Sequence, residues 1–226
     1  MGSEFFDLLR SGLERFPKLS AALGPRKNEA LLKIVAYRDA ILQENTRQNL
    51  TRLLGPTEFY WGHIEDVFQL LETFDLEYPA LDIGTGGGVP GIPAAILTDQ
   101  PWILLDSELR KTEFLARVTQ ELNIPNIQVV HDRVERVIEG LAPATLVSRA
   151  VGKVEKLYGW THHCSTWNSM ILFKGPSFEA EWAELLQSKY RKKLSIQDTH
   201  EYSVTSQEGE AERLRRIVRV LPSRQR

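Results

Sequence analysis

Hydrophobic side chains in the first third of the chain recur at the three- and four-residue spacing that is typical of helices. Pro17 and the Gly-Pro pairs at 24–25 and 55–56 interrupt this pattern. We therefore expect a helical extension over residues 1–76, with Thr57 as the cap of its third helix. The apolar positions that define the helices are Phe5, Phe6, Leu9, Leu13, Leu31, Leu32, Val35, Ile41, Leu42, Phe68, Leu71 and Phe74.

From residue 77 onward, short apolar stretches alternate with amphipathic ones. Strands that alternate with helices require a parallel sheet with right-handed crossovers and helices on both faces. Within residues 190–226, the segments 200–205 and 213–221, joined near Gly209, predict an antiparallel hairpin at the sheet edge. The sequence thus predicts a Rossmann-like α/β domain over residues 77–226 with a mostly parallel, seven-stranded sheet. The other expected strands are 81–83, 102–105, 127–130, 145–148 and 169–173, and the expected helices are 91–98, 108–122, 133–139, 153–163 and 178–189.

The most informative motif follows the first predicted strand, where an acid and a glycine-rich turn precede a helix. It reads Ala80-Leu81-Asp82-Ile83-Gly84-Thr85-Gly86-Gly87-Gly88-Val89-Pro90-Gly91-Ile92-Pro93. Glycines let the backbone turn sharply and approach a ligand closely, and the N–H groups at the start of the helix face whatever the turn holds. In such sheets the ligand lies at the carboxyl ends of the strands. The motif therefore predicts a nucleotide-like cofactor beside the first strand.

Two cofactor families use such a turn, and the chain contains both patterns. Asp82 with Gly84, Gly86 and Gly88 forms D-x-G-x-G-x-G, whereas Gly86, Gly88 and Gly91 form the dinucleotide pattern G-x-G-x-x-G. A carboxylate before the turn suits the ammonium of the methionine part of S-adenosylmethionine and repels a pyrophosphate. The prolines after the turn also lack N–H groups that a pyrophosphate would use. We therefore favour S-adenosylmethionine and keep a nicotinamide-dependent oxidoreductase as the alternative.

Residues at the ends of later strands complete the predicted site. Asp106 lies about twenty residues after the turn, where an acid accepts both ribose hydroxyls. The segment 132–135 follows the third strand and is expected to flank the adenine, although Glu135 could instead serve only as a favourable first-turn acid. Arg149 ends the fourth strand and could pair with the cofactor carboxylate, an RNA phosphate or an internal acid. The predicted cofactor-binding residues are Asp82, Gly84, Gly86, Gly88, Val89, Asp106, Arg133, Val134, Glu135 and Arg149.

The net charge of −2 hides an asymmetry along the chain. From Lys189 to the end there are ten Lys and Arg and five acids, a net of +5, so the remainder carries −7. A basic tail on an acidic body is a candidate contact for a polyanion, and a solvated charged edge is the alternative. We expect the tail to lie away from the glycine-rich turn, and Lys174 to be a phosphate contact or a surface lysine. The candidate RNA-binding residues are Arg149, Lys174, Lys192, Lys193, Arg215 and Arg219.

Composition sets further boundaries. With 42% hydrophobic and 26% charged residues, the chain has the composition of an ordinary soluble globular protein. It has no apolar stretch near the roughly twenty residues of a membrane span and no signal-like start, so we expect a cytoplasmic protein without membrane contact. Cys164 is the only cysteine and is expected to fill the core on a helix. The run His162-His163-Cys164 is too compact to hold a metal, so none is expected.

Seven blocks of the chain carry a family resemblance through their order and spacing. They are Asn49-Leu50-Thr51, His63-Ile64 with Asp66, Asp82 through Pro93, Leu104-Leu105-Asp106-Ser107 with Arg110-Lys111, Arg133-Val134-Glu135, Val147-Ser148-Arg149-Ala150, and Lys174-Gly175. In these blocks the chain resembles the bacterial small-subunit ribosomal RNA guanine-N7 methyltransferases, also called glucose-inhibited division protein B. The family usually has Arg before the histidine and Leu-Asp-Ser after the isoleucine. This chain has Gly62 there, and then Glu65, Asp66 and Val67.

The resemblance implies a class I methyltransferase fold with an N-terminal helical extension. It implies S-adenosylmethionine as the methyl donor, S-adenosylhomocysteine as the product, and a guanine in the decoding-region loop of 16S RNA as the target. The partner is then 16S RNA or the small ribosomal subunit, and we expect a monomer. The family also singles out Val134, Glu135 and Arg149 as contact positions.

The residues fit this chemistry. Guanine N7 carries a free lone pair, so it attacks the sulfonium methyl without losing a proton, and we assign no catalytic base. Proximity supplies most of the catalysis, with Arg149 as possible support. His63 and Asp66 lie one helical turn apart, which favours either a mutual hydrogen bond or a substrate role. A small-molecule methyltransferase and a non-enzymatic RNA-binding protein remain as alternatives.

Overall fold

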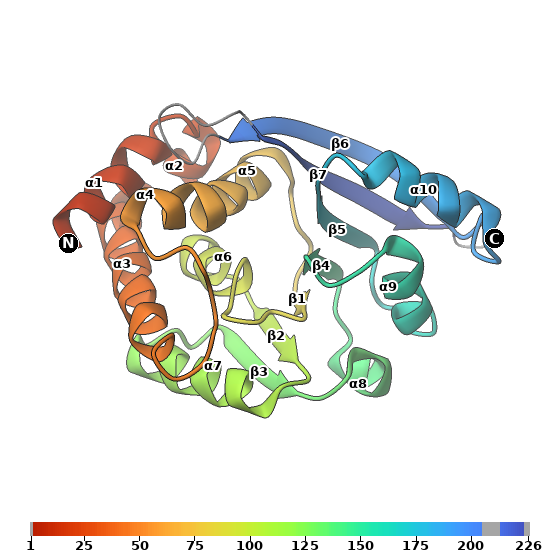
Figure 1. Cartoon of the computed structure of the whole chain (residues 1–226), viewed down its shortest axis with the longest axis horizontal. Coiled ribbons are helices and arrows are strands. Elements are labelled where there is room, and N and C mark those ends of the chain that lie inside the picture. Colours follow the sequence, from red (N-terminus) through yellow and green to blue (C-terminus); the bar gives the residue numbers. More distant parts are fainter. Residues whose placement is uncertain (1, 205–212, 224–226) are drawn as a thin grey trace.

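The computed structural model describes residues 2–204 and 213–223, and Figure 1 shows their arrangement. The first helices form the extension, and a π-helical turn at Tyr60–Ile64 joins α4 to α5. A short 3-10 turn, Gly24–Arg26, joins α2 to α3. The helices are α1 (Gly2–Leu13), α2 (Pro17–Leu23), α3 (Lys27–Glu44), α4 (Pro56–Phe59), α5 (Glu65–Thr73), α6 (Gly91–Thr98), α7 (Leu109–Glu121), α8 (Val134–Leu141), α9 (Val154–Thr161) and α10 (Phe178–Gln187).

The strands form one seven-stranded sheet in the order β3-β2-β1-β4-β5-β7-β6. The first five strands are parallel, and β7 runs antiparallel to both β5 and β6. This confirms the predicted mostly parallel sheet, and the bounds of the five parallel strands agree with the expected ones within one residue. The strands are β1 (Ala80–Ile83), β2 (Trp102–Asp106), β3 (Ile127–His131), β4 (Thr145–Arg149), β5 (Ser169–Lys174), β6 (Leu194–Val204) and β7 (Arg213–Pro222).

The terminal hairpin differs from its prediction in one strand. Strand β6 begins at Leu194, six residues before the expected start at 200. After the buried Leu194, residues 195–199 are all exposed, so this part of the strand lacks the alternation of apolar and polar residues by which strands are recognised. The predicted turn near Gly209 lies outside the described residues.

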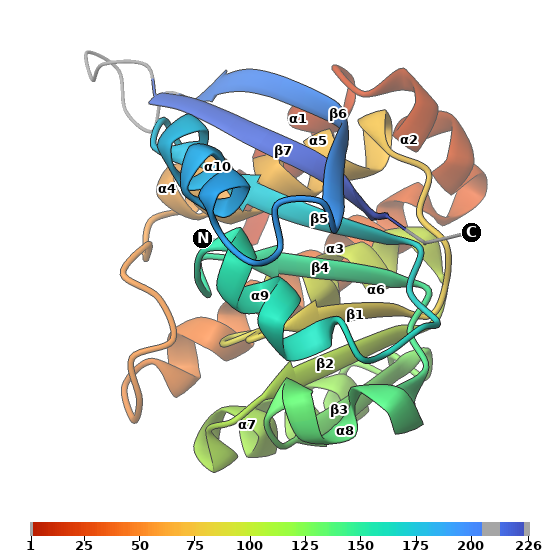
Figure 2. The same cartoon turned by 90° about the vertical axis from the view of Figure 1, so that its right-hand side faces the viewer.

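Helices cover both faces of the sheet, as Figure 2 shows. One buried cluster packs α8, α9 and α10 against one face. The other cluster packs α6 and α7 against the opposite face and continues into α1, α3 and α5. The extension therefore shares its core with the sheet. Helix α6 lies between the two and is buried from Gly91 to Leu97, which explains its uniformly apolar sequence.

One local prediction in the extension is wrong. Thr57 does not cap a helix, because it lies inside α4, and Gly55 is the residue that precedes the helix. The Gly55 N–H donates to Oε2 of Glu58 over 3.0 Å. Glu58 thus supplies the half of a capping box in which a carboxylate reaches back to the backbone N–H of the residue before the helix. Within the described residues, no helix is long and apolar enough to cross a membrane.

The topology gathers four segments at one edge of the sheet. The carboxyl ends of β1, β4 and β5 are neighbours through the pairs Ile83 with Ser148 and Arg149 with Phe173. Strand β7 begins at the same edge because it runs antiparallel to β5, with Arg216 opposite Lys174. The loop after β1 and residues near 149, 174 and 215 therefore converge.

Candidate functional site

The loop after β1 adopts a conformation that requires glycine. Gly84, Gly86 and Gly88 have φ values of 66°, 60° and 102°, which side chains rarely tolerate. A Cβ on Gly84 or Gly88 would collide with neighbouring side chains at 2.6 and 2.7 Å. A Cβ on Gly86 would meet no atom within 4 Å. Gly84 and Gly88 thus serve packing, whereas Gly86 faces open space that a ligand can enter.

The buried Asp82 carboxylate binds this loop and the first residue of α6. Its Oδ2 accepts hydrogen bonds from the Thr85 hydroxyl at 2.7 Å and the Gly91 N–H at 3.0 Å. Its Oδ1 is buried and has no hydrogen-bond partner. Burial raises the pKa of the carboxyl to about 7, although Thr85 and Gly91 favour the charged form. A Cβ on Gly91 would collide with Leu104 at 2.2 Å, so this glycine is explained by packing alone.

Asp106 joins the end of β2 to the same loop. Its Oδ2 accepts from the Gly86 N–H at 2.9 Å, and its Oδ1 accepts from the Glu108 N–H at 3.0 Å. The carboxylate is therefore adjacent to the residue that faces open space. Its expected ribose role stays a prediction, as do the roles of Arg133, Val134 and Glu135, which follow β3 at the start of α8.

A cavity of about 570 Å³ opens beside the loop, within the usual size range of ligand pockets. The loop forms one wall, the extension a second, and the ends of β4, β5, β6 and β7 the rest. Of the predicted cofactor-binding residues, four line this cavity, and six do not: Asp82, Gly88, Asp106, Arg133, Val134 and Glu135. The lining residues are Ile41, Leu50, Thr51, Gly62, His63, Asp66, Gly84, Thr85, Gly86, Gly87, Val89, Arg149, Ala150, Phe173, Lys174, Gly175, Tyr202, Arg215 and Arg216.

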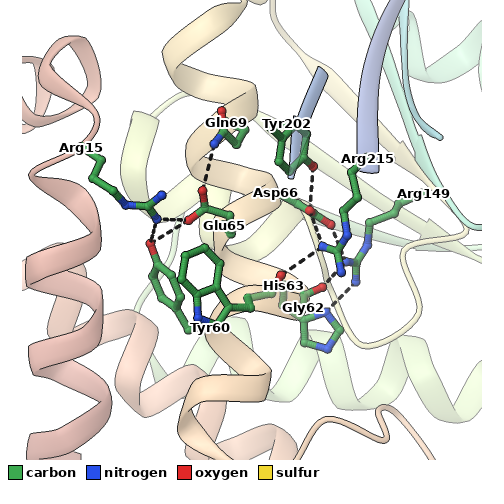
Figure 3. Close-up of polar contacts among 11 residues, drawn as sticks. Arg15, Tyr60, Gly62, His63, Glu65, Asp66, Gln69, Arg149, Tyr202 and Arg215 are labelled. Carbon is green, nitrogen blue, oxygen red and sulfur yellow. Dashed lines mark hydrogen bonds and ion pairs between the residues drawn. The ribbon is translucent and has the colours of Figure 1, made fainter. Parts of the chain in front are cut away.

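Asp66 lies at the centre of a polar network on the cavity wall, drawn in Figure 3. Its Oδ1 accepts from Arg215 Nη1 at 2.6 Å and from the Tyr202 hydroxyl at 2.7 Å. Its Oδ2 accepts from Arg149 Nη1 at 3.1 Å. Burial and the neighbouring Asp66 carboxylate raise the pKa of the Tyr202 hydroxyl, which keeps it a proton donor. We call Asp66, Arg149, Arg215, Tyr202 and His63 the Asp66 cluster.

His63 is a neutral member of this cluster. Arg149 Nη2 lies 2.7 Å from Nδ1 of His63, and a guanidinium only donates, so Nδ1 must accept. The proton is then on Nε2, which lies 2.9 Å from the Thr51 hydroxyl. Burial and the charges of Arg149 and Arg215 lower the pKa of His63 to about 3. Of the two roles considered for His63 and Asp66, a mutual hydrogen bond is not what the structure shows, because Arg149 binds both of them, and a substrate role stays a prediction.

The π-helical turn supplies the remaining partners of the two arginines. Arg149 Nη1 donates to the Gly62 carbonyl at 2.8 Å, and Arg215 Nη1 donates to the Trp61 carbonyl at 3.0 Å. Glycine is needed at 62 because a Cβ would lie 2.1 Å from Leu53 Cδ1. The internal ion pair considered for Arg149 is therefore present, and it binds the extension to the sheet.

The extension also contacts the glycine loop directly. The buried Tyr37 hydroxyl, on α3, donates to the Gly87 carbonyl at 2.7 Å. A Cβ on Gly87 would meet Leu50 and Ile41 at 3.5 and 3.9 Å, both of which line the cavity. Asn45 Oδ1 accepts from the Leu50 and Thr51 N–H groups, which shapes this segment. The extension is thus part of the site.

Lys174 occupies a position between two cavities. Its Nζ donates to both carboxylate oxygens of Glu181, at 2.7 and 3.0 Å, and to the Gly152 carbonyl at 2.9 Å. Its side chain is only 11% exposed, which contradicts the alternative of a surface lysine, and the alternative of a phosphate contact stays a prediction. Lys174 and Phe173 line both the main cavity and a second one of about 480 Å³ between α9 and α10.

Arg215 was expected away from the glycine loop, and this is wrong. It lines the same cavity as Gly86. The reason is topological, because β7 runs antiparallel to β5 and therefore begins at the carboxyl ends of the parallel strands. Strand direction across the hairpin cannot be read from the local sequence alone.

The other candidates of the basic segment do not join one surface. Lys192 and Lys193 precede β6, whose start pairs with the end of β7, at the opposite end of the sheet from the glycine loop. Arg219 donates to the Asp75 carbonyl at 2.7 Å and covers the Phe74 ring. Arg216 pairs with Glu179 and Glu201. Much of the positive charge of the described hairpin is therefore compensated locally.

Cys164 is buried, as expected, with its Sγ 3.6 Å from the Ile138 carbonyl. It does not lie on a helix, however, because α9 ends at Thr161. Sequence reasoning gave no site role to Tyr37, Thr51 or Tyr202. Only Tyr37 carried a usable signal, since a tyrosine at a buried helix position brings a hydroxyl that needs a partner.

Comparison with protein families matches residues 30–214 to the family GidB, rRNA small subunit methyltransferase G. A ribosomal RNA small subunit methyltransferase G of Hydrogenovibrio crunogenus is 37% identical over 140 residues, which cover 62% of this chain and 64% of that protein. The protein of the same name from Pseudomonas paraeruginosa is 37% identical over 147 residues, 65% of this chain and 67% of that one. That of Solibacter usitatus is 27% identical over 187 residues, 82% and 89% of the two chains. The match thus spans less than two thirds of the Hydrogenovibrio protein.

Two solved structures share the fold. The METTL16 MTase domain superposes with a TM-score of 0.52 at 13% identity, covering 83% of this chain and 79% of that one. Human methyltransferase 10 domain containing protein gives a TM-score of 0.51 at 13% identity, covering 82% and 94%. Together with the strand order, these likenesses identify a class I methyltransferase fold with N-terminal helices.

Proposed function

Because the chain belongs to the rRNA small subunit methyltransferase G family, we propose that it transfers the methyl group of S-adenosylmethionine to N7 of a guanine in the decoding-region loop of 16S RNA. The observation that carries the proposal is one cavity with two unlike walls. The first is a glycine loop with open space at Gly86, and the second holds the guanidinium groups of Arg149 and Arg215. The first suits a cofactor and the second a phosphodiester.

The residues present fit S-adenosylmethionine. Open space at Gly86 lets a ligand approach the backbone, and Asp106 lies beside it for the ribose hydroxyls. The loop from Gly84 to Val89 would hold the methionine end. The unpaired Oδ1 of Asp82 is a buried acceptor close to this loop, and a nearby ammonium would favour the charged carboxylate. Val134 and Glu135 would flank the adenine. When bound, the cofactor supplies an electrophilic methyl group on a sulfonium.

The proposed reaction needs no proton transfer. The lone pair of guanine N7 forms the new N–C bond while the S–C bond breaks, and the positive charge passes from sulfur to the guanine ring. The protein then has to bind the two reactants and align them, which accounts for most of the rate. Arg149 and Arg215 would contact RNA phosphate, with Lys174 nearby at the end of β5. A reaction on 16S RNA or the small subunit would take place in the cytoplasm.

The decisive experiment is methyl transfer from labelled S-adenosylmethionine to small subunits, naked 16S RNA and a metabolite extract in parallel. We expect label at N7 of one guanine in the RNA arms and none in the extract. The matched control is Gly86→Val, which should lose cofactor binding while remaining folded, because the branched side chain would occupy the open space at Gly86. Label only in the extract would replace the proposal with a small-molecule methyltransferase. No label in any arm would contradict the methyl-transfer function.

A nicotinamide oxidoreductase is tested with the same protein. A true ligand raises the midpoint of thermal unfolding by mass action. We expect S-adenosylmethionine to raise it and a nicotinamide dinucleotide to leave it unchanged. The G-x-G-x-x-G pattern adds no support for a dinucleotide, because Gly91 is explained by its contacts with Leu104 and Asp82.

A further inference from the structure

We infer that Asp66 is the positioning residue of this site, which holds Arg149 and Arg215 side by side on the cavity wall so that methyl transfer is productive. The inference rests on the proposed function. It adds a residue to that function which neither binds the cofactor nor contacts the reacting atoms.

The geometry separates the carboxylate from the arginines it holds. The Asp66 side chain is 5% exposed, whereas those of Arg149 and Arg215 are 20% and 27% exposed. Its two oxygens already accept three hydrogen bonds, from both arginines and Tyr202. The carboxylate therefore lies behind the guanidinium groups, which reach towards the cavity. A substrate would meet the arginines first.

The two positive charges of Arg149 and Arg215 need a negative charge close by. Two guanidinium groups that line one wall repel each other, and a single carboxylate between them compensates one of the two charges. His63 adds no charge, because it accepts a hydrogen bond from Arg149 in its neutral form. The cluster therefore keeps one net positive charge, which suits the single negative charge of a phosphodiester.

The partners of the arginines come from distant parts of the chain. Arg149 ends β4, Arg215 lies in β7, and Asp66 lies in the first turn of α5. The carbonyls of Trp61 and Gly62, in the π-helical turn just before α5, accept from the same Nη1 atoms as Asp66 does. The extension thus holds Arg215 at two points and Arg149 at three, and among the residues that the structure describes Asp66 is the one side chain that binds both guanidinium groups. Single π-turns are often found at functional sites.

The test compares Asp66→Asn with Glu65→Gln in the full-length protein. Glu65 is a matched control because it is the neighbouring buried carboxylate and also binds an arginine and a tyrosine, but it does not line the cavity. The measurements are kcat and KM for small subunits, the Kd for RNA and the Kd for S-adenosylmethionine. The unfolding free energy of each variant is also measured, so that the activity assays can be run where every variant is folded.

For Asp66→Asn we expect kcat to fall about tenfold to a hundredfold, as misplaced binding groups do. The Kd for RNA should stay the same or decrease, because the wall gains a positive charge. Glu65→Gln should leave both unchanged. A merely structural role for Asp66 would lower the unfolding free energy and leave kcat of the folded enzyme intact, and that result would overturn the inference.

A second readout does not depend on activity. The ¹⁵N signal of His63 Nδ1 reports the hydrogen bond from Arg149, and His63→Gln assigns it among the five histidines. It should shift in Asp66→Asn and not in Glu65→Gln; an unshifted signal would contradict the inference.

If Asp66→Asn does not fold, Tyr202→Phe is the second variant, because it removes one donor to Asp66 without a change in charge. It should lower kcat by less than the decrease of about tenfold to a hundredfold expected for Asp66→Asn, and it should retain RNA affinity. Full activity of Tyr202→Phe would then count against the inference. If the wild-type protein does not methylate RNA, the proposed function fails, while the His63 signal still decides whether Asp66 holds Arg149.

Discussion

Two consecutive carboxylates, Glu65 and Asp66, begin the same helix and have opposite surroundings. Glu65 binds Arg15, the Tyr60 hydroxyl at 2.8 Å and the Gln69 amide at 2.9 Å, all within the extension (Figure 3). Asp66 binds groups from β4, β6 and β7 beside the cavity. Successive helical side chains point about 100° apart, so two neighbours in sequence can serve different layers of the molecule.

The comparison shows how an appended helical segment becomes part of a site. The Glu65 contacts join the turn after α1 to α5 and the π-helical turn, which ties the parts of the extension together. The Asp66 contacts connect that unit to the end of the sheet. Where the family usually has leucine, this chain has Glu65, a buried acid whose partner is Arg15 in the turn between α1 and α2. The departure is therefore accommodated inside the extension and leaves the Asp66 cluster in place.

The largest expected effect is on stability and belongs to Glu65. Glu65→Ala leaves the buried Tyr60 hydroxyl without its charged acceptor, whereas the half-exposed Arg15 can be solvated, so the unfolding free energy should fall by about 3 kcal/mol. Urea denaturation measures this. The control is Glu29→Ala, which removes an exposed pair with Lys33 and should change stability by less than about 1 kcal/mol. If Glu65→Ala lowered the unfolding free energy as little as the control does, Glu65 would not be an anchor of the extension.

The next effect is on the reaction and belongs to Arg149. In Arg149→Ala, charge-assisted hydrogen bonds to substrate are lost, and kcat/KM for RNA should decrease by a factor equivalent to about 2–3 kcal/mol. RNA affinity should decrease less, since Arg215 remains. The exposed Arg10 of α1 provides a control in Arg10→Ala, which should retain full activity. If kcat/KM and RNA affinity decreased by the same factor, Arg149 would contribute only to RNA binding.

A smaller effect concerns pH. The pKa of His63 is about 3 in the folded protein, below its ordinary value of about 6.5, so the unfolded chain binds an extra proton between these values. Stability from this group is complete above pH 6.5 and decreases as the pH falls through that window. Between pH 7 and 5.5 the loss should be about 1.2 kcal/mol. His63→Gln should lack this component when unfolding free energies are compared at the two pH values; identical slopes would mean that folding does not lower the pKa of His63.

The smallest effect concerns the extension's contact with the cofactor loop. Tyr37→Phe removes the hydroxyl that donates to the Gly87 carbonyl, so affinity for S-adenosylmethionine should weaken by about 0.5–1 kcal/mol. Titration calorimetry resolves this difference. Tyr158→Phe, a buried tyrosine on α9 outside both cavities, is the control and should leave affinity unchanged. An unaltered Kd for Tyr37→Phe would show that the loop keeps its shape without the extension.

The sequence by itself determined the parts that depend on local patterns. Hydrophobic periodicity placed the parallel strands and their helices, and α6 matches its predicted bounds of 91–98. The glycine-rich motif predicted a sharp turn, and the structure forms it with positive φ angles, which only glycine adopts readily. The order of seven blocks predicted the family, which the match over residues 30–214 confirms. Each of these inferences uses neighbours in sequence or motifs of fixed spacing.

Only the tertiary structure decided the partners of charged side chains. Asp66 and Arg215 are 149 positions apart, and they meet because β7 runs antiparallel at the edge of the sheet. Arg149 was expected at the cavity, but whether its partner was a ligand or an internal acid stayed open until Asp66 and His63 were seen beside it. Asp82 points into the protein rather than into the cavity, because Thr85 and Gly91 bind its oxygen. Charges have no period along a sequence, and their partners follow from strand order and direction.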